Sequence, residues 1–321
     1  MKIGLTATCA LVWVLCVPAD TVTCGGTYPQ HLQGVATDGD ALYWSFTDRL
    51  VKTDGTGRVL RTVTVPSHHG DLCWGAGTLY VAVNLGVFNA ATGADSQVWA
   101  YDPETLAVRR TWPLPEVVHG AGGIAIHGGS FWVVGGLPET GTTNVVYEYG
   151  PDFAFVRGHE LATGYTALGF QTIDYAFGAF RIGVYGTETG AGGYTLVVSP
   201  TFDAVTRIAA DTSVGILNWR GRLWRAGVTG ATGYICTDES LAGTVGTDWP
   251  DDFAEQVAAH HPRPAGGQVA SGAACEVDAR IHASADAAAA LGVEGRATSF
   301  ETSGEQAVDI RRPSGCVLVL R

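Results

Sequence analysis

The chain has little positive charge and no place where that charge gathers. Lysine and arginine together number 19 against 31 aspartates and glutamates, which gives a formal net charge of −12. No basic run or patch interrupts the sequence. Nucleic acids and anionic membranes attract proteins through clustered basic side chains, so both are excluded as expected partners. A carbohydrate or another polar small molecule remains compatible with this composition.

Several catalytic and metal-binding motifs are also missing. The sequence has no GxSxG nucleophile turn, no phosphate-binding P-loop, no HExxH zinc motif and no CxxC pair. It therefore gives no sign of a serine hydrolase, a nucleotide enzyme or a structural zinc site.

Only one apolar run is long enough to suggest a targeting signal. Lys2 precedes an apolar stretch over residues 3–17, and Val17, Pro18 and Ala19 resemble a cleavage site. This pattern predicts a secretory signal peptide over residues 1–19. The alternative is a membrane anchor, but the run is shorter than the roughly 18–20 residues that a span needs. We expect a secreted or periplasmic protein with no membrane insertion once the signal is removed.

What the sequence does contain is a unit repeated five times. Each unit has a short apolar strand, a Gly or Asp turn and an aromatic-rich strand, and it begins at Gly34, Gly70, Gly123, Gly169 or Gly215. The spacings are 36 (34 to 70), 53 (70 to 123), 46 (123 to 169) and 46 (169 to 215). Periods of this size built only from strand patterns predict an all-β fold, a five-bladed β-propeller.

The repeat predicts a propeller over residues 20–240, a linker over 241–264 and a small β-rich segment over 265–321. The fifth unit lacks a fourth strand, and we expect residues 21–28 to supply it, because a ring needs its last blade fixed to its first. A six-bladed ring that uses residues 265–321 is the alternative.

Polar residues recur just before the innermost strand of each of the first four blades, where segments far apart in sequence converge on the axis. His31, His69 and His119 are the candidate catalytic groups, and His69 is preferred over its neighbour His68. Three imidazoles near one axis suit acid–base chemistry or a divalent metal, the only cofactor suggested. The alternative is that these histidines brace the ring by bonding backbone carbonyls. The supporting polar residues, expected to bind substrate, are Gln33, Asp71, Asn84, Asn89, Glu116, Tyr165 and Gln171.

The motifs HLQG, HHGD, YVAVN, HGAGG and YEY, which lie within residues 31–161, resemble secreted bacterial β-propeller proteins of the broad quinoprotein and YVTN-like group. The resemblance implies a fold and not an activity. Propeller polysaccharide lyases that use central histidines and a metal are similar at a general level. Two functions are therefore open: a secreted carbohydrate-active lyase or hydrolase, and a non-catalytic propeller that binds a glycan or a protein.

Five cysteines remain after signal removal. If residues 21–28 pair with the strand near residues 233–238, then Cys24 and Cys236 come close, and we expect them to form a disulfide. Cys275 and Cys316 would form a second bridge and leave Cys73 as a buried free thiol. The alternative is that all five are reduced.

Overall fold

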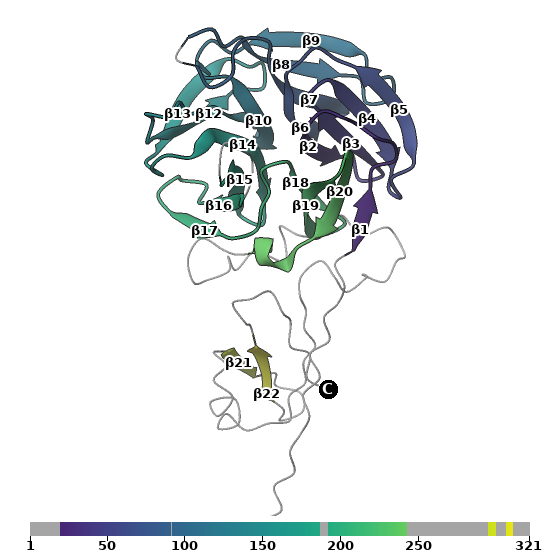
Figure 1. The fold of residues 1–321 in the computed structure, drawn as a ribbon. Coiled ribbons are helices and arrows are strands. Elements are labelled where there is room, and N and C mark those ends of the chain that lie inside the picture. The colour runs from purple at the N-terminus through teal and green to yellow at the C-terminus, as the bar shows by residue number, and fades with distance from the viewer. Residues whose placement is uncertain (1–19, 91, 187–191, 243–294, 300–305, 311–321) are drawn as a thin grey trace, which may run out of the picture. The chain divides into compact units, whose positions relative to one another are not determined.

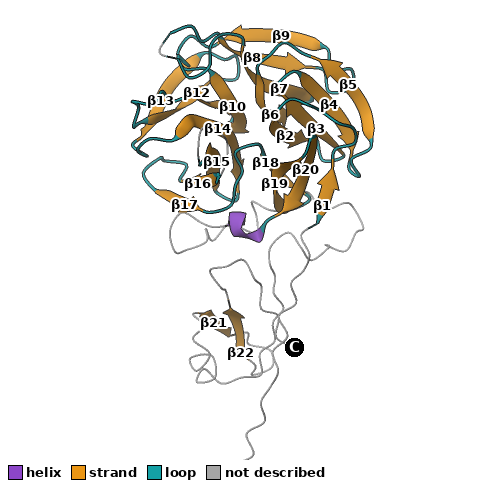
Figure 2. Cartoon of the chain, viewed as in Figure 1, coloured by secondary structure: helices purple, strands orange, loops and turns teal. Residues whose placement is uncertain are grey.

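The structure is a computed structural model that describes residues 20–90, 92–186, 192–242, 295–299 and 306–310. Within these residues the chain forms five four-stranded antiparallel sheets and one two-stranded sheet. The five larger sheets stand side by side around an axis, as the ribbon in Figure 1 and the strand colouring in Figure 2 show. The predicted five-bladed propeller is confirmed.

Each blade runs from an inner strand at the axis to an outer strand at the rim. The first blade consists of β2 (Leu32–Thr37), β3 (Ala41–Phe46), β4 (Arg49–Asp54) and β5 (Val59–Thr64). The second consists of β6 (His69–Gly75), β7 (Thr78–Asn84), β8 (Ser96–Tyr101) and β9 (Val108–Pro113). The third consists of β10 (Ala121–His127), β11 (Ser130–Gly135), β12 (Asn144–Tyr149) and β13 (Phe155–Leu161).

The fourth blade consists of β14 (Ala167–Ala176), β15 (Ala179–Tyr185), β16 (Tyr194–Val198) and β17 (Val205–Ile208). The fifth has β18 (Ile216–Trp219), β19 (Arg222–Thr229) and β20 (Thr232–Thr237), and its outer strand is β1 (Thr21–Thr23). The short 3-10 helix η1 (Glu239–Ala242) follows β20.

Four blades turn from their first to their second strand through the same two-residue hairpin. Both turn residues have positive φ in the pairs Ala76–Gly77, Gly128–Gly129, Phe177–Gly178 and Arg220–Gly221. This backbone matches a type I′ turn, whose twist agrees with the twist of the strands it joins. The Gly that recurs in the turn between the first two strands of a repeat is therefore required by the backbone conformation of that turn.

The glycines that begin the repeats allow neighbouring inner strands to touch. A Cβ on Gly34 would lie 2.1 Å from Asp71 Oδ1, and one on Gly70 would lie 2.3 Å from the carbonyl oxygen of Gly122. A Cβ on Gly215 would lie 3.2 Å from the backbone nitrogen of Val35, where the last blade meets the first. The ring is thus narrow at its centre because side chains are missing there.

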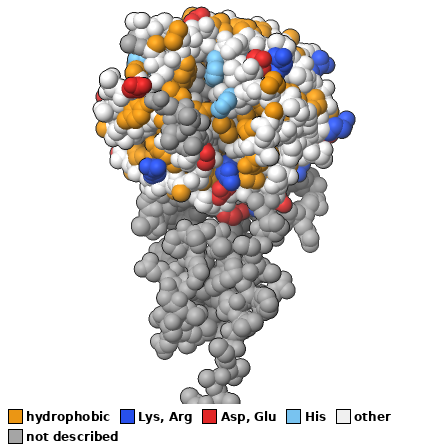
Figure 3. Space-filling model, in the orientation of Figure 1, with side chains coloured by type: hydrophobic (Ala, Val, Ile, Leu, Met, Phe, Trp, Pro, Cys, Tyr) orange, Lys and Arg blue, Asp and Glu red, His pale blue; other side chains and the backbone are white. Residues whose placement is uncertain are grey.

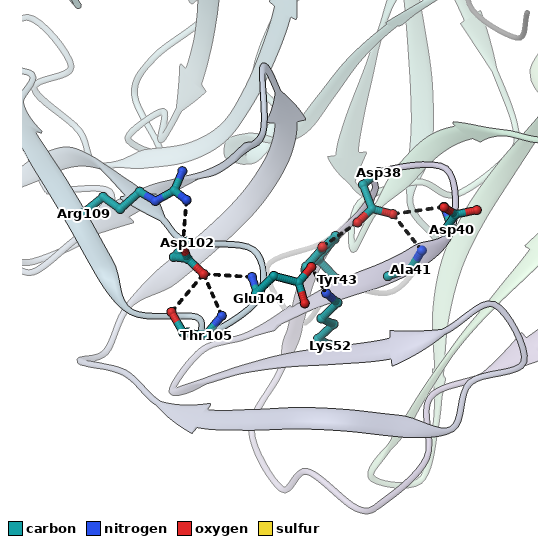
Figure 4. Close-up of polar contacts among 9 residues, drawn as sticks. All are labelled: Asp38, Asp40, Ala41, Tyr43, Lys52, Asp102, Glu104, Thr105 and Arg109. Atoms are coloured by element: carbon teal, nitrogen blue, oxygen red, sulfur yellow. Dashed lines mark hydrogen bonds and ion pairs between the residues drawn. The ribbon is translucent and has the colours of Figure 1, made fainter.

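Blade-to-blade packing is mostly apolar and is supplemented by polar links. Lys52, buried in β4 of the first blade, donates to Glu104 Oε1 of the second blade at 2.8 Å. Beside it, the Tyr43 hydroxyl donates to Asp38 Oδ2 at 2.6 Å, as Figure 4 shows. These contacts lie at the end of the blades where the chain leaves each inner strand, opposite the end where it enters.

The ring closes as predicted, but the predicted disulfide is wrong. β1 pairs antiparallel with β20, so the N-terminal strand completes the fifth blade. Its register sets Cys236 opposite Thr21, and the Cys24 amide bonds the Gly233 carbonyl, three residues further along. Three residues of strand correspond to about 10 Å, beyond disulfide reach. Cys24, Cys236 and Cys73 are all free thiols, and Cys73 is half-buried.

The remaining predictions about domains lie largely outside the described residues. These include the signal over 1–19, the linker beyond residue 242, and both Cys275 and Cys316. The chain divides into two units, one over residues 19–274 and a second that includes β21 (Gly295–Ser299) and β22 (Gln306–Ile310). Of the second unit the structure describes one hairpin, in which β21 pairs with β22. Within the described residues these strands join none of the blades, so the six-bladed alternative is wrong. No helix in the described part of the chain is long and apolar enough to span a membrane.

Candidate functional site

One face of the ring carries the connections that lead into the inner strands and those that follow the second strands. We call it the histidine face, after His31, His68 and His119, and it also includes Phe88 and Tyr165. Figure 3 shows histidine side chains near the middle of one face of the ring, among hydrophobic and uncharged side chains. Val87 and Val118 are 62% and 49% exposed on this face, and Tyr165 is 43% exposed.

His69 does not reach this face. Its side chain is fully buried, with Nδ1 2.7 Å from the carbonyl oxygen of Pro66 and Nε2 2.6 Å from the hydroxyl of Tyr101. Its ring also meets the edge of Trp99. Burial lowers the pKa of His69 to about 4, so the ring stays neutral. Both ring nitrogens are thus engaged by the second blade and by the connection that leads into it.

His68 takes the place that the sequence analysis gave to His69. Its ring is half-buried and stacks on Phe88 with centroids 6.1 Å apart. Burial lowers its pKa, and the nearby His31 lowers it further. His31 itself is exposed, so the two rings occupy the same part of the histidine face.

His119 precedes Gly120, a residue whose backbone approaches Phe88. A Cβ on the adjoining Gly120 would fall 2.5 Å from Phe88 Cδ2. His119 Nδ1 lies 3.0 Å from the carbonyl oxygen of Ala90, and its own carbonyl accepts the amide of Asn89 at 2.8 Å. The connection over residues 85–90 thereby brings Phe88 against His68 and next to the segment that carries His119.

The other predicted residues divide between local structural bonds and this face. Asn84 donates to the Gly86 carbonyl and accepts the Asp95 amide, so it shapes the connection that carries Phe88. Asn89 has φ of 62°, and its Oδ1 is buried without a partner among the described residues.

Three further residues bond away from the histidines: Gln33 to Thr47, Gln171 to the Leu168 carbonyl, and Glu116 to the Tyr149 hydroxyl.

Asp71 points into the ring. It is 1% exposed, and its Oδ2 accepts the backbone amide of Ile173 at 3.1 Å. Asp174, on the same strand as Ile173, is the second carboxyl of this axial pair. Its Oδ1 accepts the Tyr175 amide at 2.9 Å. Burial raises the pKa of Asp71 well above its ordinary value, and raises the pKa of Asp174 to about 7.

The three predicted histidines do not form a metal centre in this arrangement. Among the described residues, no group of three or more His, Cys, Asp or Glu side chains is placed to hold a metal ion. His69 has both ring nitrogens engaged by protein atoms, which removes one of the proposed ligands.

Sequence reasoning missed three residues. His68 and Phe88 belong to the histidine face, and Asp174 belongs to the axial carboxyl pair. His68 was available in the same motif as His69, but His68 contacts Phe88 whereas His69 is buried against Pro66 and Tyr101. Phe88 belongs to a long connection whose path no periodicity predicts. Asp174 had a signal, since an acidic residue inside an apolar inner strand is unusual.

No known protein family matches the sequence, and no curated protein is significantly similar to it. A xylan β-1,4-xylosidase from Bacillus halodurans is similar in structure, with a TM-score of 0.50 and 11% identity over 70% of this chain. The chain spans 54% of that enzyme's length, so the likeness concerns the fold alone.

Two further similar structures have lower scores. A gluconolactonase from Xanthomonas campestris has a TM-score of 0.41 and 15% identity, covering 69% of this chain and 90% of its own. BamB from Moraxella catarrhalis has a TM-score of 0.34 and 11% identity, covering 66% of this chain and 61% of its own. Such values assign no activity.

Proposed function

We propose that this protein is a non-catalytic recognition propeller that binds a polar ligand on its histidine face. The observation that carries the proposal is the cluster around Phe88, flanked by His68 and by the His119–Gly120 segment. Ligand sites combine apolar and aromatic surface with a few placed polar groups, and this cluster has both. Exposed Val87, Val118 and Tyr165 enlarge the apolar surface on the same face.

The geometry favours binding over catalysis. Hydrolysis or elimination on a sugar needs an acid and a base that both reach the substrate. His69, the predicted third group, is buried against Pro66 and Tyr101, and the carboxyl of Glu116 accepts the Tyr149 hydroxyl. The lyase or hydrolase function stays an untested prediction and is the competing outcome below. We place the protein in the secreted or periplasmic class on the strength of the predicted signal.

The experiment measures binding and turnover with the full chain. The purified protein is screened against glycans, peptides and small polar compounds, and each bound compound is also assayed for chemical conversion. We expect binding without conversion, and at least about a tenfold affinity loss in Phe88→Ala. Leu60→Ala is the control, because Leu60 is an exposed apolar residue that lies on the outer strand β5 and not on the histidine face.

Two results would overturn the proposal. Conversion of a bound compound that is abolished in His119→Ala would favour the enzyme. Binding that Phe88→Ala leaves unchanged would move the site away from this face.

A further inference from the structure

The tautomer of a neutral His119 ring follows from its hydrogen bond to the carbonyl oxygen of Ala90. A backbone carbonyl only accepts, so the nitrogen that bonds Ala90 must carry the proton, and that nitrogen is Nδ1. In the neutral ring the other nitrogen, Nε2, then has a free lone pair. No described residue bonds Nε2, and the side chain is only half-buried. His119 therefore offers a hydrogen-bond acceptor on the histidine face.

His68 has the opposite tautomer. Its Nδ1 is buried and has no partner among the described residues. Burying an N–H without an acceptor costs more than burying a lone pair in this position, so the proton lies on Nε2. Charging the ring would place an unpaired N–H at Nδ1, which agrees with the lowered pKa. His68 therefore offers a neutral donor at Nε2.

Phe88 contacts His68 and the residue next to His119. Its ring stacks on His68, with centroids 6.1 Å apart, and it packs against the Cα of Gly120, next to His119. An apolar ring flanked by a donor and an acceptor matches a sugar, which has C–H faces and hydroxyl groups along its edges.

The charge of this region limits the ligand further. Arg49 follows the turn at Thr47, whose carbonyl accepts the His69 amide, and it is paired with Asp48 at 3.0 Å. A carboxylate or phosphate only accepts hydrogen bonds and an ammonium only donates, so each would satisfy one imidazole and not the other. A hydroxyl group both donates and accepts, so a polyol satisfies both.

We infer that the ligand of the histidine face is a neutral polyhydroxylated molecule, a glycan or a cyclitol, held by donation from His68 Nε2 and acceptance at His119 Nε2. This inference rests on the proposed function and names its ligand class. Tyr165, 43% exposed, adds a second aromatic surface for a longer chain.

The first test reads the tautomers without any ligand. Nitrogen-15 NMR of the full chain distinguishes protonated from unprotonated ring nitrogens. We expect Nε2–H for His68 and Nδ1–H for His119 at neutral pH. The reverse assignment at either residue would overturn the inference, whatever the protein binds.

The second test measures affinity for neutral oligosaccharides and inositol, with matched uronates and amino sugars of the same linkage. We expect a neutral compound to bind at least about tenfold tighter than its charged counterparts. His68→Phe should lose about tenfold, whereas His68→Gln keeps a side-chain N–H donor and should lose less. His119→Phe should lose a similar amount, and His127→Phe, which changes a histidine at the far end of β10, should not.

The outcomes separate the two proposals. If a non-sugar ligand binds and Phe88→Ala abolishes its binding, the face is right and the ligand class is wrong. If no neutral compound binds, or a uronate binds more tightly, the ligand class is also wrong. If a sugar binds and Phe88→Ala has no effect, the proposed site itself fails.

Discussion

The carboxyl group of Asp71 in the second blade accepts the backbone amide of Ile173 in the fourth blade, 3.1 Å away and past the intervening third blade. The inner strand of each blade is one edge of its sheet, so the backbone amides on its axial side have no neighbouring strand to pair with. The carboxyl groups of Asp71 and Asp174 supply acceptors for such amides. Asp174 accepts the backbone amide of Asn218 in β18. Buried carboxyls thus connect inner strands of different blades.

Removing this axial acceptor should destabilise the ring. Asp71→Ala leaves the Ile173 amide unpaired, and we expect a loss of about 1–3 kcal/mol in the free energy of unfolding. Asp71→Asn keeps a side-chain oxygen in the same place and should cost less. Urea unfolding measures both, with Asp40→Ala as a control on the exposed turn between β2 and β3. Equal stability of Asp71→Ala and the wild type would contradict a role for the carboxyl in joining the blades.

The same pair predicts an unusual pH dependence. Burial raises the pKa of Asp174 to about 7, so the folded chain keeps a proton that the unfolded chain releases above its ordinary value of about 4. As the pH rises through this window, the free energy of unfolding should fall by up to about 1.4 kcal/mol per unit for this group, and the loss is complete above pH 7. Asp71 acts in the same direction.

Asp174→Asn should flatten the profile between pH 4 and 7. Urea midpoints measured across this range give the slope. If the wild type and Asp174→Asn have the same dependence of stability on pH, then Asp174 titrates normally. Arg181 is the charged group that lowers the pKa of Asp174. Asp174 in turn raises the pKa values of Asp71 and Cys73.

The fold could be predicted from sequence because its rules are local. Glycine turns and aromatic second strands recur with each blade, and the missing fourth strand after β20 left one place for residues 21–28. The site was harder, since His68 and His69 are adjacent and only packing decides which one faces outward. The register of β6 is irregular between His69 and Leu72, so simple alternation along the strand does not apply. Phe88 arrives through a long connection, which sequence patterns do not position.

His69 should affect stability and not binding. His69→Ala removes the partner of the Tyr101 hydroxyl and leaves a cavity beside Trp99, so we expect a loss of about 2–4 kcal/mol. Tyr101→Phe removes only the hydroxyl and should cost about 1 kcal/mol. Thermal unfolding gives both values, and the ligand affinity of the folded variants should equal that of the wild type. A folded His69 variant that loses activity or binding would restore the catalytic prediction.

Because the described cysteines are free thiols, the stability of the propeller should not depend on a reductant. Cys24, Cys73 and Cys236 are free, and burial raises the pKa of Cys24 to about 12. We expect no change in unfolding temperature on adding a reductant to the Cys275→Ser/Cys316→Ser variant, in which these three are the cysteines outside the predicted signal. Thiol titration should find them slow to react in the folded protein and fully reactive in denaturant. A stability loss on reduction would revive the bridge between Cys24 and Cys236.

The last prediction concerns ring closure, which is secured by strand pairing in the absence of that bridge. Val22 of β1 lies opposite Ile235 of β20, and Cys24 and Tyr28 belong to the apolar cluster where the first and fifth blades meet. Proline at position 22 restricts φ and removes a backbone donor, so Val22→Pro should detach β1 and cost about 3 kcal/mol or more. Val22→Thr keeps a β-branched side chain and is the matched control. Hydrogen exchange should show amides of β20 opening in Val22→Pro while those of β11 and β12 stay protected. If β20 remains as protected as in Val22→Thr, then β1 does not hold the fifth blade in place, and closure depends on the inner strands alone.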